Sequence, residues 1–232
     1  MKKHTVKKHI MNSNFLARFS FVVLLCLTLN ACVTAPAYDY TAFRAAQPVS
    51  ILVLPPTNLS PDVRASYSLL AYMTYPLAEA GYYVVPVALM DAAFKENGVH
   101  NPDEAQAIPA EKLRSIFGAD AALYTEITEY GNSYKLVMSE TAVAARSRLV
   151  DLRTGALLWE GSARASSAEQ RNNNGGGLAG LLVQALVEQV VNNIVDNSHM
   201  YAGMTSERLL SPRMGGILHG PRSPHYGKEA QK

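Results

Sequence analysis

The sequence predicts an α/β fold with a mixed sheet, in which a parallel β-α-β beginning leads into an antiparallel meander and helices pack on the sheet. Two apolar segments, 49–54 and 82–85, are separated by a segment of helical periodicity. A crossover of this length joins parallel strands through a right-handed connection. The strand-like segments after residue 120 are joined by short turns, which indicates the meander.

The first strand covers 49–54, because its apolar run is nearly continuous, as in strands buried on both faces, and ends at two prolines. A helix is expected over 63–80, where apolar residues recur at spacings of three and four, with Gly81 as its C-terminal cap. The second strand covers 82–85. Turn and N-cap chemistry before the helix comes from Asn58, Ser60, Pro61 and Asp62.

A short helix over 87–95 comes next, followed by a polar, proline-bearing loop over 100–108. Pro109 opens another helix at its first position, and Gly118 closes it. The third strand is expected over 121–130, with a tight turn at Gly131-Asn132. The rest of the meander is a returning strand with Tyr134, Leu136 and Met138 on one face, a strand over 141–152, a turn at 153–155 and a strand over 157–165.

The C-terminal part is predicted to be a joint, a helix and a tail. Residues 169–177 are polar and glycine-rich. Residues 178–197 carry a polar stripe at every fourth position, widened by Gln189 and Asn193, and are otherwise rich in Leu, Ala, Val and Ile, which predicts an amphipathic helix with a wide buried face. After Tyr201 the periodicity is lost, and glycine and proline favour an irregular or disordered tail.

The N-terminus has the pattern of a secretory signal. Five basic residues precede or flank an apolar run over 19–29, which is too short to span a membrane. Residues 29–32 read Leu-Asn-Ala-Cys and resemble the bacterial lipobox. That resemblance implies cleavage before Cys32 and acylation of Cys32. An ordinary secretory signal or an N-terminal membrane anchor is the alternative, and Met11 is an alternative start.

The acyl chains would hold Cys32 on a membrane, because several chains bind far more tightly than one. Val33 follows the cysteine in place of aspartate, which by resemblance to the enteric sorting rule favours the outer membrane, facing the periplasm. The predicted organisation is a signal peptide over 1–31, a lipidated tether over 32–48, an α/β domain over 49–201 and an irregular tail over 202–232. A tether of this length reaches about 50–60 Å.

Removing the signal changes the charge of the chain. Five of the 21 basic residues and none of the 19 acidic residues precede Cys32, so residues 32–232 carry 16 basic against 19 acidic residues, a net −3. No basic excess remains that would favour nucleic acid. Cys26 leaves with the signal, so after acylation of Cys32 no thiol remains for a disulfide, a metal or a nucleophile.

Two segments resemble known proteins. Residues 49–60 resemble the opening strand and turn of periplasmic lipoproteins related to the curli-secretion protein CsgG and to the N-terminal domain of TolB, and residues 150–160 resemble a later hairpin of that group. As a whole the chain resembles a bacterial lipoprotein family of unknown function that includes a neisserial vaccine-candidate surface antigen. The resemblance implies a TolB N-terminal/CsgG-like α/β sandwich and co-operation with a CsgG-like lipoprotein in export or envelope assembly.

The sequence contains no convincing catalytic or metal-binding constellation. The glycines at 175–177 lack the Gly-Lys-Ser/Thr that a phosphate loop needs, so a flexible linker is favoured. Ser60 and Asp62 are interpreted as capping residues rather than as part of a triad. The histidines lack the paired spacing of metal ligands and are expected at the surface: His100, His199, His219 and His225. We therefore expect no catalytic residue, no metal and no cofactor.

The charged and aromatic residues of the meander are expected to be structural. Glu126 and Glu129 are predicted on opposite strand faces, so they are no carboxylate pair. Arg146 and Arg148 share a face, which is expected to be solvated, with an acidic partner as the alternative. Trp159 is expected to anchor the core or an edge rather than to bind a ligand.

Tyrosines gather around the first helix and the second strand, at Tyr67, Tyr72, Tyr75, Tyr82 and Tyr83. Not all of them can be buried with their hydroxyls satisfied, and tyrosine is enriched at interfaces. The exposed share of this cluster, together with the apolar face of the 178–197 helix, is therefore a candidate partner surface. Ordinary core and boundary tyrosines are the alternative.

These observations favour a non-enzymatic outer-membrane lipoprotein that binds other envelope proteins as a component of a periplasmic export or envelope-assembly complex. A small-molecule or peptidoglycan-binding module is the first alternative, and a lipid-anchored hydrolase is the second. Homo-oligomer formation and exposure at the cell surface stay open at this point.

Overall fold

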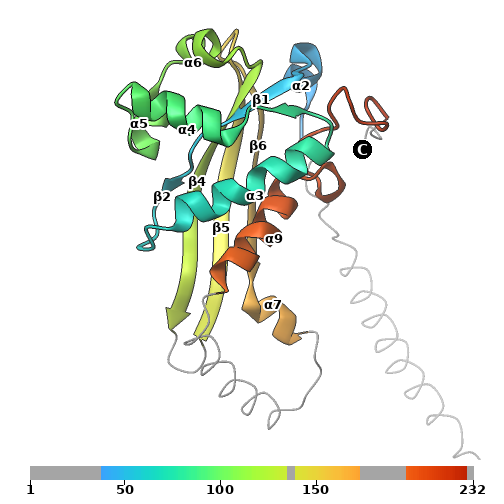
Figure 1. The fold of residues 1–232 in the computed structure, drawn as a ribbon. Coiled ribbons are helices and arrows are strands. Elements are labelled where there is room, and N and C mark those ends of the chain that lie inside the picture. The colour runs from blue at the N-terminus through green and yellow to red at the C-terminus, as the bar shows by residue number, and fades with distance from the viewer. Residues whose placement is uncertain (1–37, 135–138, 173–196, 229–232) are drawn as a thin grey trace, which may run out of the picture. The chain divides into compact units, whose positions relative to one another are not determined.

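The fold is organised around one sheet with the strand order β3-β1-β4-β5-β6, and β2 lies beside β4 (Figure 1). In this computed structural model, residues 38–134, 139–172 and 197–228 are described, and the residues from Asp39 onward form one unit. The strands are β1 Ser50–Val53, β2 Thr57–Asn58, β3 Tyr83–Val84, β4 Ala121–Tyr134, β5 Ser139–Asp151 and β6 Leu157–Ser166. β1 pairs in parallel with β3 and β4, whereas β4, β5 and β6 pair antiparallel. The predicted mixed sheet is confirmed.

The helices pack on this sheet. They are α2 Thr41–Ala46, α3 Ala65–Glu79, α4 Val87–Glu96, α5 Pro102–Ala107, α6 Ala110–Phe117, α7 Ser167–Asn172 and α9 Ser198–Leu210, with a short 3-10 helix over Pro212–Met214. α3 and α9 cross one another over the same face of the sheet, and α4, α5 and α6 lie together at the upper left of the view, with α5 in contact with β2 (Figure 1). Ile51 and Leu52 of β1 are both fully buried, which confirms that this strand has two covered faces.

Local chemistry explains the ends of the early elements. The Asp120 carboxylate accepts hydrogen bonds from the N–H groups of Val49 and Ser50, which fixes β1 against the start of β4. Gly81 takes a φ of 95° just after α3, and the N–H of Tyr82 bonds back to the carbonyl of Leu77. Because this left-handed position favours glycine, the predicted C-terminal cap is confirmed.

The predicted turn at Gly131-Asn132 is wrong. β4 continues to Tyr134, and Gly131 and Asn132 pair with Ala142 and Thr141 of β5. The Thr141 hydroxyl also donates to the side chain of Asn132, so cross-strand pairing overrides the local turn preference. The alternating residues Leu136 and Met138 lie outside the described residues.

The predicted loop over 100–108 is also wrong, because it contains helix α5. Asn101 is the N-cap, and its side chain accepts a hydrogen bond of 2.8 Å from the N–H of Glu104. Pro102 occupies the first helical turn, and Ala105 is buried. This Asn-Pro start is a recognised helix signal that the polar composition concealed.

The expected tether reaches less far along the chain than predicted. Residues 41–46 form α2, and Phe43 is buried in the core. The hydroxyl of Tyr40 donates to the carbonyl of Gly216. One buried aromatic residue in a segment otherwise poor in apolar residues is enough to tie it to the domain, which therefore begins near residue 39 rather than at 49.

The expected irregular tail is wrong over 202–210, where α9 continues to Leu210. Its buried side includes Ala202, Thr205 and Ser206, so small and polar residues hide the helical period. Residues 211–228 are largely irregular but packed, since Ile217 is fully buried and the N–H of Gly220 bonds to the carbonyl of Ala80 at 2.7 Å. Residues 169–172 of the expected joint are helical in α7, and the predicted helix over 178–197 lies outside the described residues except for Asn197.

Candidate functional site

The outward side of α3 is the most unusual surface of the described residues. No charged side chain occurs from Ala65 to Ala78, yet the helix is exposed on one side. Val63, Tyr67, Ala71 and Tyr75 recur at every fourth position along that side, and we call these four residues the α3 face. Val63 is 86% exposed, and Tyr67 and Tyr75 are 63% and 66% exposed.

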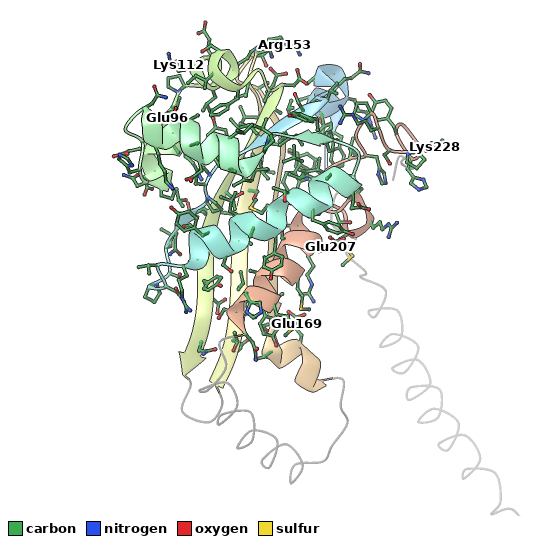
Figure 2. All side chains as sticks on the ribbon, viewed as in Figure 1. Glu96, Lys112, Arg153, Glu169, Glu207 and Lys228 are labelled. Atoms are coloured by element: carbon green, nitrogen blue, oxygen red, sulfur yellow. The ribbon has the colours of Figure 1, made fainter. Side chains whose placement is uncertain are left out.

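A surface helix normally carries charged residues on its solvent side. The charged residues labelled in Figure 2 lie on other elements: Glu96 on α4, Lys112 on α6, Glu169 on α7 and Glu207 on α9. Packing against the core accounts for Leu69, Met73 and Leu77 on the inner side of α3. It does not account for the large apolar residues on the outward side. Large apolar groups left in contact with water mark interaction surfaces.

The five predicted tyrosines divide between core and surface. Tyr82 is buried, and its hydroxyl donates to the carbonyl of Leu218 at 2.6 Å. Tyr67, Tyr72, Tyr75 and Tyr83 are exposed, which confirms that the cluster cannot be buried as a whole. Tyr72 lies at the flank of the α3 face, against Gly203 of α9, and the guanidinium of Arg222 lies over the ring of Tyr83.

A groove of about 380 Å³ continues from one end of the α3 face. Val63 just before α3 and Tyr67 and Leu70 of α3 line one side of it, and Val87 and Phe94 of α4 line the other. Asp91 and Lys95 form an ion pair of 2.7 Å at the groove, and this hydrogen bond raises the pKa of Lys95. Since these two charges satisfy one another, the groove offers a partner mainly apolar contact.

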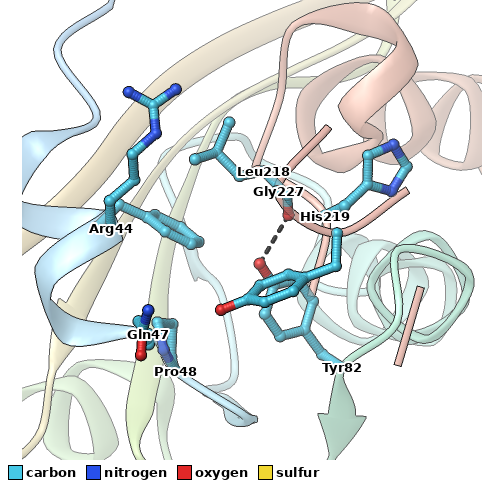
Figure 3. A pocket seen from close by; sticks show the side chains of 9 residues that line it. Arg44, Gln47, Pro48, Tyr82, Leu218, His219 and Gly227 are labelled. Carbon is cyan, nitrogen blue, oxygen red and sulfur yellow. Dashed lines mark hydrogen bonds between the residues drawn. The ribbon is translucent and has the colours of Figure 1, made fainter. Parts of the chain in front are cut away.

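A second cavity, of about 350 Å³, lies between α2 and the C-terminal segment (Figure 3). Arg44 and Gln47 come from α2 and its cap, whereas Leu218 and His219 come from the C-terminal segment. The bond from Tyr82 to the carbonyl of Leu218 lies in its wall. This cavity therefore combines apolar walls with polar groups that could orient a ligand.

The sheet face that carries Arg146 holds paired charges. Glu126 bonds to Arg146 at 2.7 Å, and Glu129 bonds to Arg164 at 2.8 Å. A bulge between Ile127 and Glu129 shifts the register, so the two glutamates share a face and the prediction of opposite faces is wrong. Each carboxylate is bound to a guanidinium, which leaves no pair for general acid–base work.

Arg164 also donates a hydrogen bond of 3.0 Å to Glu140. The hydrogen bond that Arg164 donates to Glu129, and to a lesser extent the one to Glu140, raises the pKa of Arg164. The guanidinium of Arg148 lies 5.9 Å from the ring centre of Tyr124. The predicted exposure of Arg146 and Arg148 is confirmed, and both have partners within the domain. Trp159 is buried beside Gly161, as expected of a core anchor.

The described residues hold no cluster of three or more histidine, cysteine, aspartate or glutamate side chains that could bind a metal. Ser60 bonds to Asn58 at 2.7 Å and Asp62 to Arg64 at 2.8 Å, so these residues build the turn before α3. The helix itself begins after Arg64 without a side-chain cap, which corrects the N-cap interpretation. Cys32 and the glycines at 175–177 lie outside the described residues.

Two of the four histidines do come together. The rings of His219 and His225 are 5.3 Å apart, and Nδ1 of His219 lies 3.1 Å from the hydroxyl of Ser223. This contact could not be inferred from the sequence, because the segment that holds both histidines is irregular and has no periodicity. Within the described ranges, no helix is both long and apolar enough to cross a membrane.

The family model described as "Putative lipoprotein GNA1162-like" matches residues 38–222, which is most of the chain. The chain belongs to this lipoprotein family. Its GNA1162-like relatives include "Putative lipoprotein NMB1124/NMB1162" of Neisseria meningitidis serogroup B, which is 48% identical over 199 residues, or 84% of this chain and 92% of the relative. The predicted membership of the neisserial lipoprotein family is thereby confirmed.

Two solved structures are similar to this GNA1162-like chain. The crystal structure of lipoprotein GNA1162 from Neisseria meningitidis is 50% identical and matches with a TM-score of 0.49 over 62% of this chain and 99% of that chain. The LpoB C-terminal domain from Salmonella enterica is 19% identical and matches with a TM-score of 0.37 over 55% of this chain and 98% of that chain.

Proposed function

We propose that the protein is a non-enzymatic lipoprotein of the outer membrane, facing the periplasm, that acts as a docking component of an envelope-assembly or export complex. Cys32 is the proposed lipidated residue, and residues 1–31 are the proposed signal peptide. Membership of a lipoprotein family and the Leu-x-Ala-Cys sequence support the anchor. Other envelope proteins are the proposed partners, and the resemblance of residues 49–60 and 150–160 suggests a CsgG-like lipoprotein among them.

The observation that carries the docking role is the uncharged, exposed α3 face. Tyrosine combines a large apolar body with a polar tip and is enriched at the centres of protein interfaces. The adjoining groove between α3 and α4 would receive an apolar side chain of the partner, because its own charges are paired. The arginine–glutamate pairs on the sheet give no comparable apolar anchor.

The proposed lipid anchor would leave only a short tether, which favours the same role. Since α2 and Tyr40 are tied to the domain, only the residues between Cys32 and Asp39 could act as a tether. Seven residues span at most about 25 Å, roughly half the reach that a tether to residue 48 would have. The domain would therefore meet partners close to the membrane surface.

A photo-reactive amino acid at Tyr67 tests the docking role in living cells. We expect covalent adducts with envelope proteins, identified by mass spectrometry after irradiation. The same probe at Glu111, an exposed residue of α6, is the matched control and should give few adducts. Equal, weak labelling at both positions, with the protein recovered only as an unlinked monomer, would contradict the proposal.

The proposed anchor is tested by Cys32→Ala. This variant should lose acylation and appear as an uncleaved or soluble form after fractionation, whereas Cys26→Ala should stay in the membrane fraction. Unchanged metabolic labelling with palmitate in the Cys32→Ala variant would refute the assignment.

A small-molecule or peptidoglycan-binding role is the second candidate, and the cavity beside α2 favours it. Arg44 could pair with a carboxylate, Gln47 could accept or donate a hydrogen bond, and Tyr226 could stack on a sugar or a ring. Soluble peptidoglycan fragments should then shift the NMR signals of the cavity residues in the parent protein and leave them unchanged in the Arg44→Ala variant. No shift with any fragment would remove this candidate.

A further inference from the structure

The α3 face has a symmetric arrangement about its centre. Ala71 is small and exposed, and Tyr67 and Tyr75 lie four residues before and after it. Beyond the tyrosines, Arg64 lies seven residues before Ala71 and Glu79 lies eight residues after it, at the two ends of the uncharged helix. Large, small and large side chains therefore alternate between a positive end and a negative end.

The two terminal charges have the signs that α3 itself disfavours. A helix is stabilised by acidic residues in its first turn and basic residues in its last turn, and α3 has neither. Arg64 stands at the positive N-terminus and Glu79 at the negative C-terminus. Arg64 forms an exposed pair with Asp62, whereas Glu79 makes no ion pair or hydrogen bond with the residues the structure describes.

We propose that the α3 face binds the α3 face of a second copy of this chain, in an antiparallel pair with its two-fold axis close to Ala71. This inference rests on the proposed docking role and names its partner. In such a pair Tyr67 lies beside Tyr75 of the other copy, and the small Ala71 residues let the helix axes approach to the usual 8–10 Å. The same patch then serves both copies, as in other two-fold dimers.

Charge complementarity favours a second copy over other partners. An antiparallel pair brings Arg64 of each copy to Glu79 of the other and places opposite helix ends side by side, so both unfavourable end charges become favourable. The helix between the ends has no charge, so self-association meets no like-charge repulsion there. A membrane surface fits less well, because residues 32–232 carry a net −3 and peripheral binding to anionic lipid needs a basic surface.

The available area fits a reversible dimer. If a whole tyrosine side chain offers about 200 Å², the exposed fractions of Tyr67, Tyr72 and Tyr75 together present about 330 Å². With Val63 and Ala71, two copies would bury on the order of 1,000 Å², which is the lower range of biological interfaces. Anchoring on one membrane would raise the effective concentration of copies and so favour this pair.

Disulfide trapping in native envelopes tests the contact. Helix axes 8–10 Å apart leave the two Cα atoms of residue 71 about 4–5 Å apart, which a disulfide can span. Ala71→Cys in the full chain should therefore form a dimer of twice the mass after mild oxidation with diamide, and reduction should reverse it. The parent protein, which has only Cys32 after processing, and Ser115→Cys on α6 are the controls, and neither should form this dimer.

Charge reversal separates a second copy from any other partner. Arg64→Glu and Glu79→Arg each place like charges together and should raise the dimer dissociation constant about five- to tenfold, by analytical ultracentrifugation of the purified full-length protein in detergent. The double variant restores opposite charges and should regain most of the affinity. If the double variant loses as much dimerisation free energy as the two single variants together, the antiparallel pair is refuted.

The outcomes also distinguish this inference from the docking role. If Ala71→Cys fails to form a dimer while the probe at Tyr67 is linked to a different envelope protein, the second copy is refuted and the docking role stands. If neither position is ever linked to a protein, both are refuted. A trapped dimer together with recovery in the double variant supports both.

Discussion

At the scale of single residues, buried charges fix the turns. Asp151 is almost fully buried at the end of β5, and one carboxylate oxygen accepts the N–H groups of Arg153 and Thr154 at 2.7 and 2.8 Å. Burial alone would raise the pKa of Asp151, but these hydrogen bonds and the guanidinium of Arg153 leave its pKa below the usual value. The turn predicted at 153–155 is confirmed, and its cause is this carboxylate.

We expect Asp151→Asn to lower the free energy of unfolding at pH 7 by about 1–2 kcal/mol, because a charge-assisted acceptor is lost. Since the pKa of Asp151 is lower in the folded than in the unfolded state, its contribution is complete above pH 4 or so and disappears as the pH falls through the folded pKa. Urea unfolding at pH 7 and pH 3 should show a difference between parent and variant that shrinks in acid. Glu96→Gln, at an exposed position, should show no difference at either pH, and a difference for Asp151→Asn that is as large at pH 3 as at pH 7 would contradict this assignment.

At the scale of elements, β6 depends on one glycine. The ring of Trp159 lies across Gly161, so a Cβ at residue 161 would overlap the Cζ2 and Cη2 atoms of that ring. Trp159 in turn is part of the core, which ties the edge strand to the rest of the sheet. Gly161, two positions after the buried Trp159, therefore tolerates less change than its partly exposed position suggests.

Gly161→Ala should destabilise the protein by about 1–3 kcal/mol, because the indole must leave its place or the strand must shift. Near-ultraviolet circular dichroism should change with it, since Trp159 is the only tryptophan in the chain. Ser162→Ala, at the next and exposed position, should change the free energy of unfolding by less than about 0.5 kcal/mol. An unaltered tryptophan signal in Gly161→Ala would count against the packing described.

Elements with a strong apolar pattern, or with a glycine or proline at their ends, could be predicted from the sequence. Elements that depend on contacts between distant residues could not. Continuous apolar runs predicted β1 and β3, and Gly81 and Gly118 marked the ends of α3 and α6. The Gly131-Asn132 pair favoured a turn locally, yet β4 continues through it and pairs with β5 as far as Tyr134. The bulge that places Glu126 and Glu129 on one face has no local signal, because it depends on the register between two strands.

At the scale of the whole molecule, both ends of the described domain close the core. Tyr40 before α2 bonds to Gly216, and Tyr82 at β3 bonds to Leu218, so the first and last described segments meet near the end of α3. Gly81 allows this approach, because a Cβ at residue 81 would overlap the backbone of Ser223. Composition predicted an irregular backbone for this C-terminal segment, but it could not reveal that the core needs Ile217.

Ile217→Ala should cost about 2–4 kcal/mol of stability, as expected for a fully buried aliphatic residue. Met214→Ala is the matched control, because Met214 is 59% exposed and lies in the same segment, and it should cost less than about 0.5 kcal/mol. Thermal unfolding monitored by circular dichroism measures both. Equal, small effects would mean that the segment is a dispensable tail.

The candidate site was predictable in part. The tyrosine cluster was visible in the sequence, because five tyrosines within 17 positions cannot all be buried. Which of them are exposed depends on the direction of α3 over the sheet, and the absence of charge on the outward side becomes meaningful only once that direction is known. The cavity beside α2 could not be inferred, since its lining joins segments more than 160 residues apart.

The central claim is that the α3 face is covered by protein in the envelope, and thiol accessibility tests it most directly. Ala78 is exposed and lies on the outward side of α3, so Ala78→Cys introduces a small probe there. Its rate of labelling by a membrane-impermeant maleimide should be at least about fivefold lower in permeabilised envelopes than in the purified, diluted protein, while Ser115→Cys on α6 should react equally in both. Equal labelling of Ala78→Cys in both preparations would show an uncovered face and contradict the account.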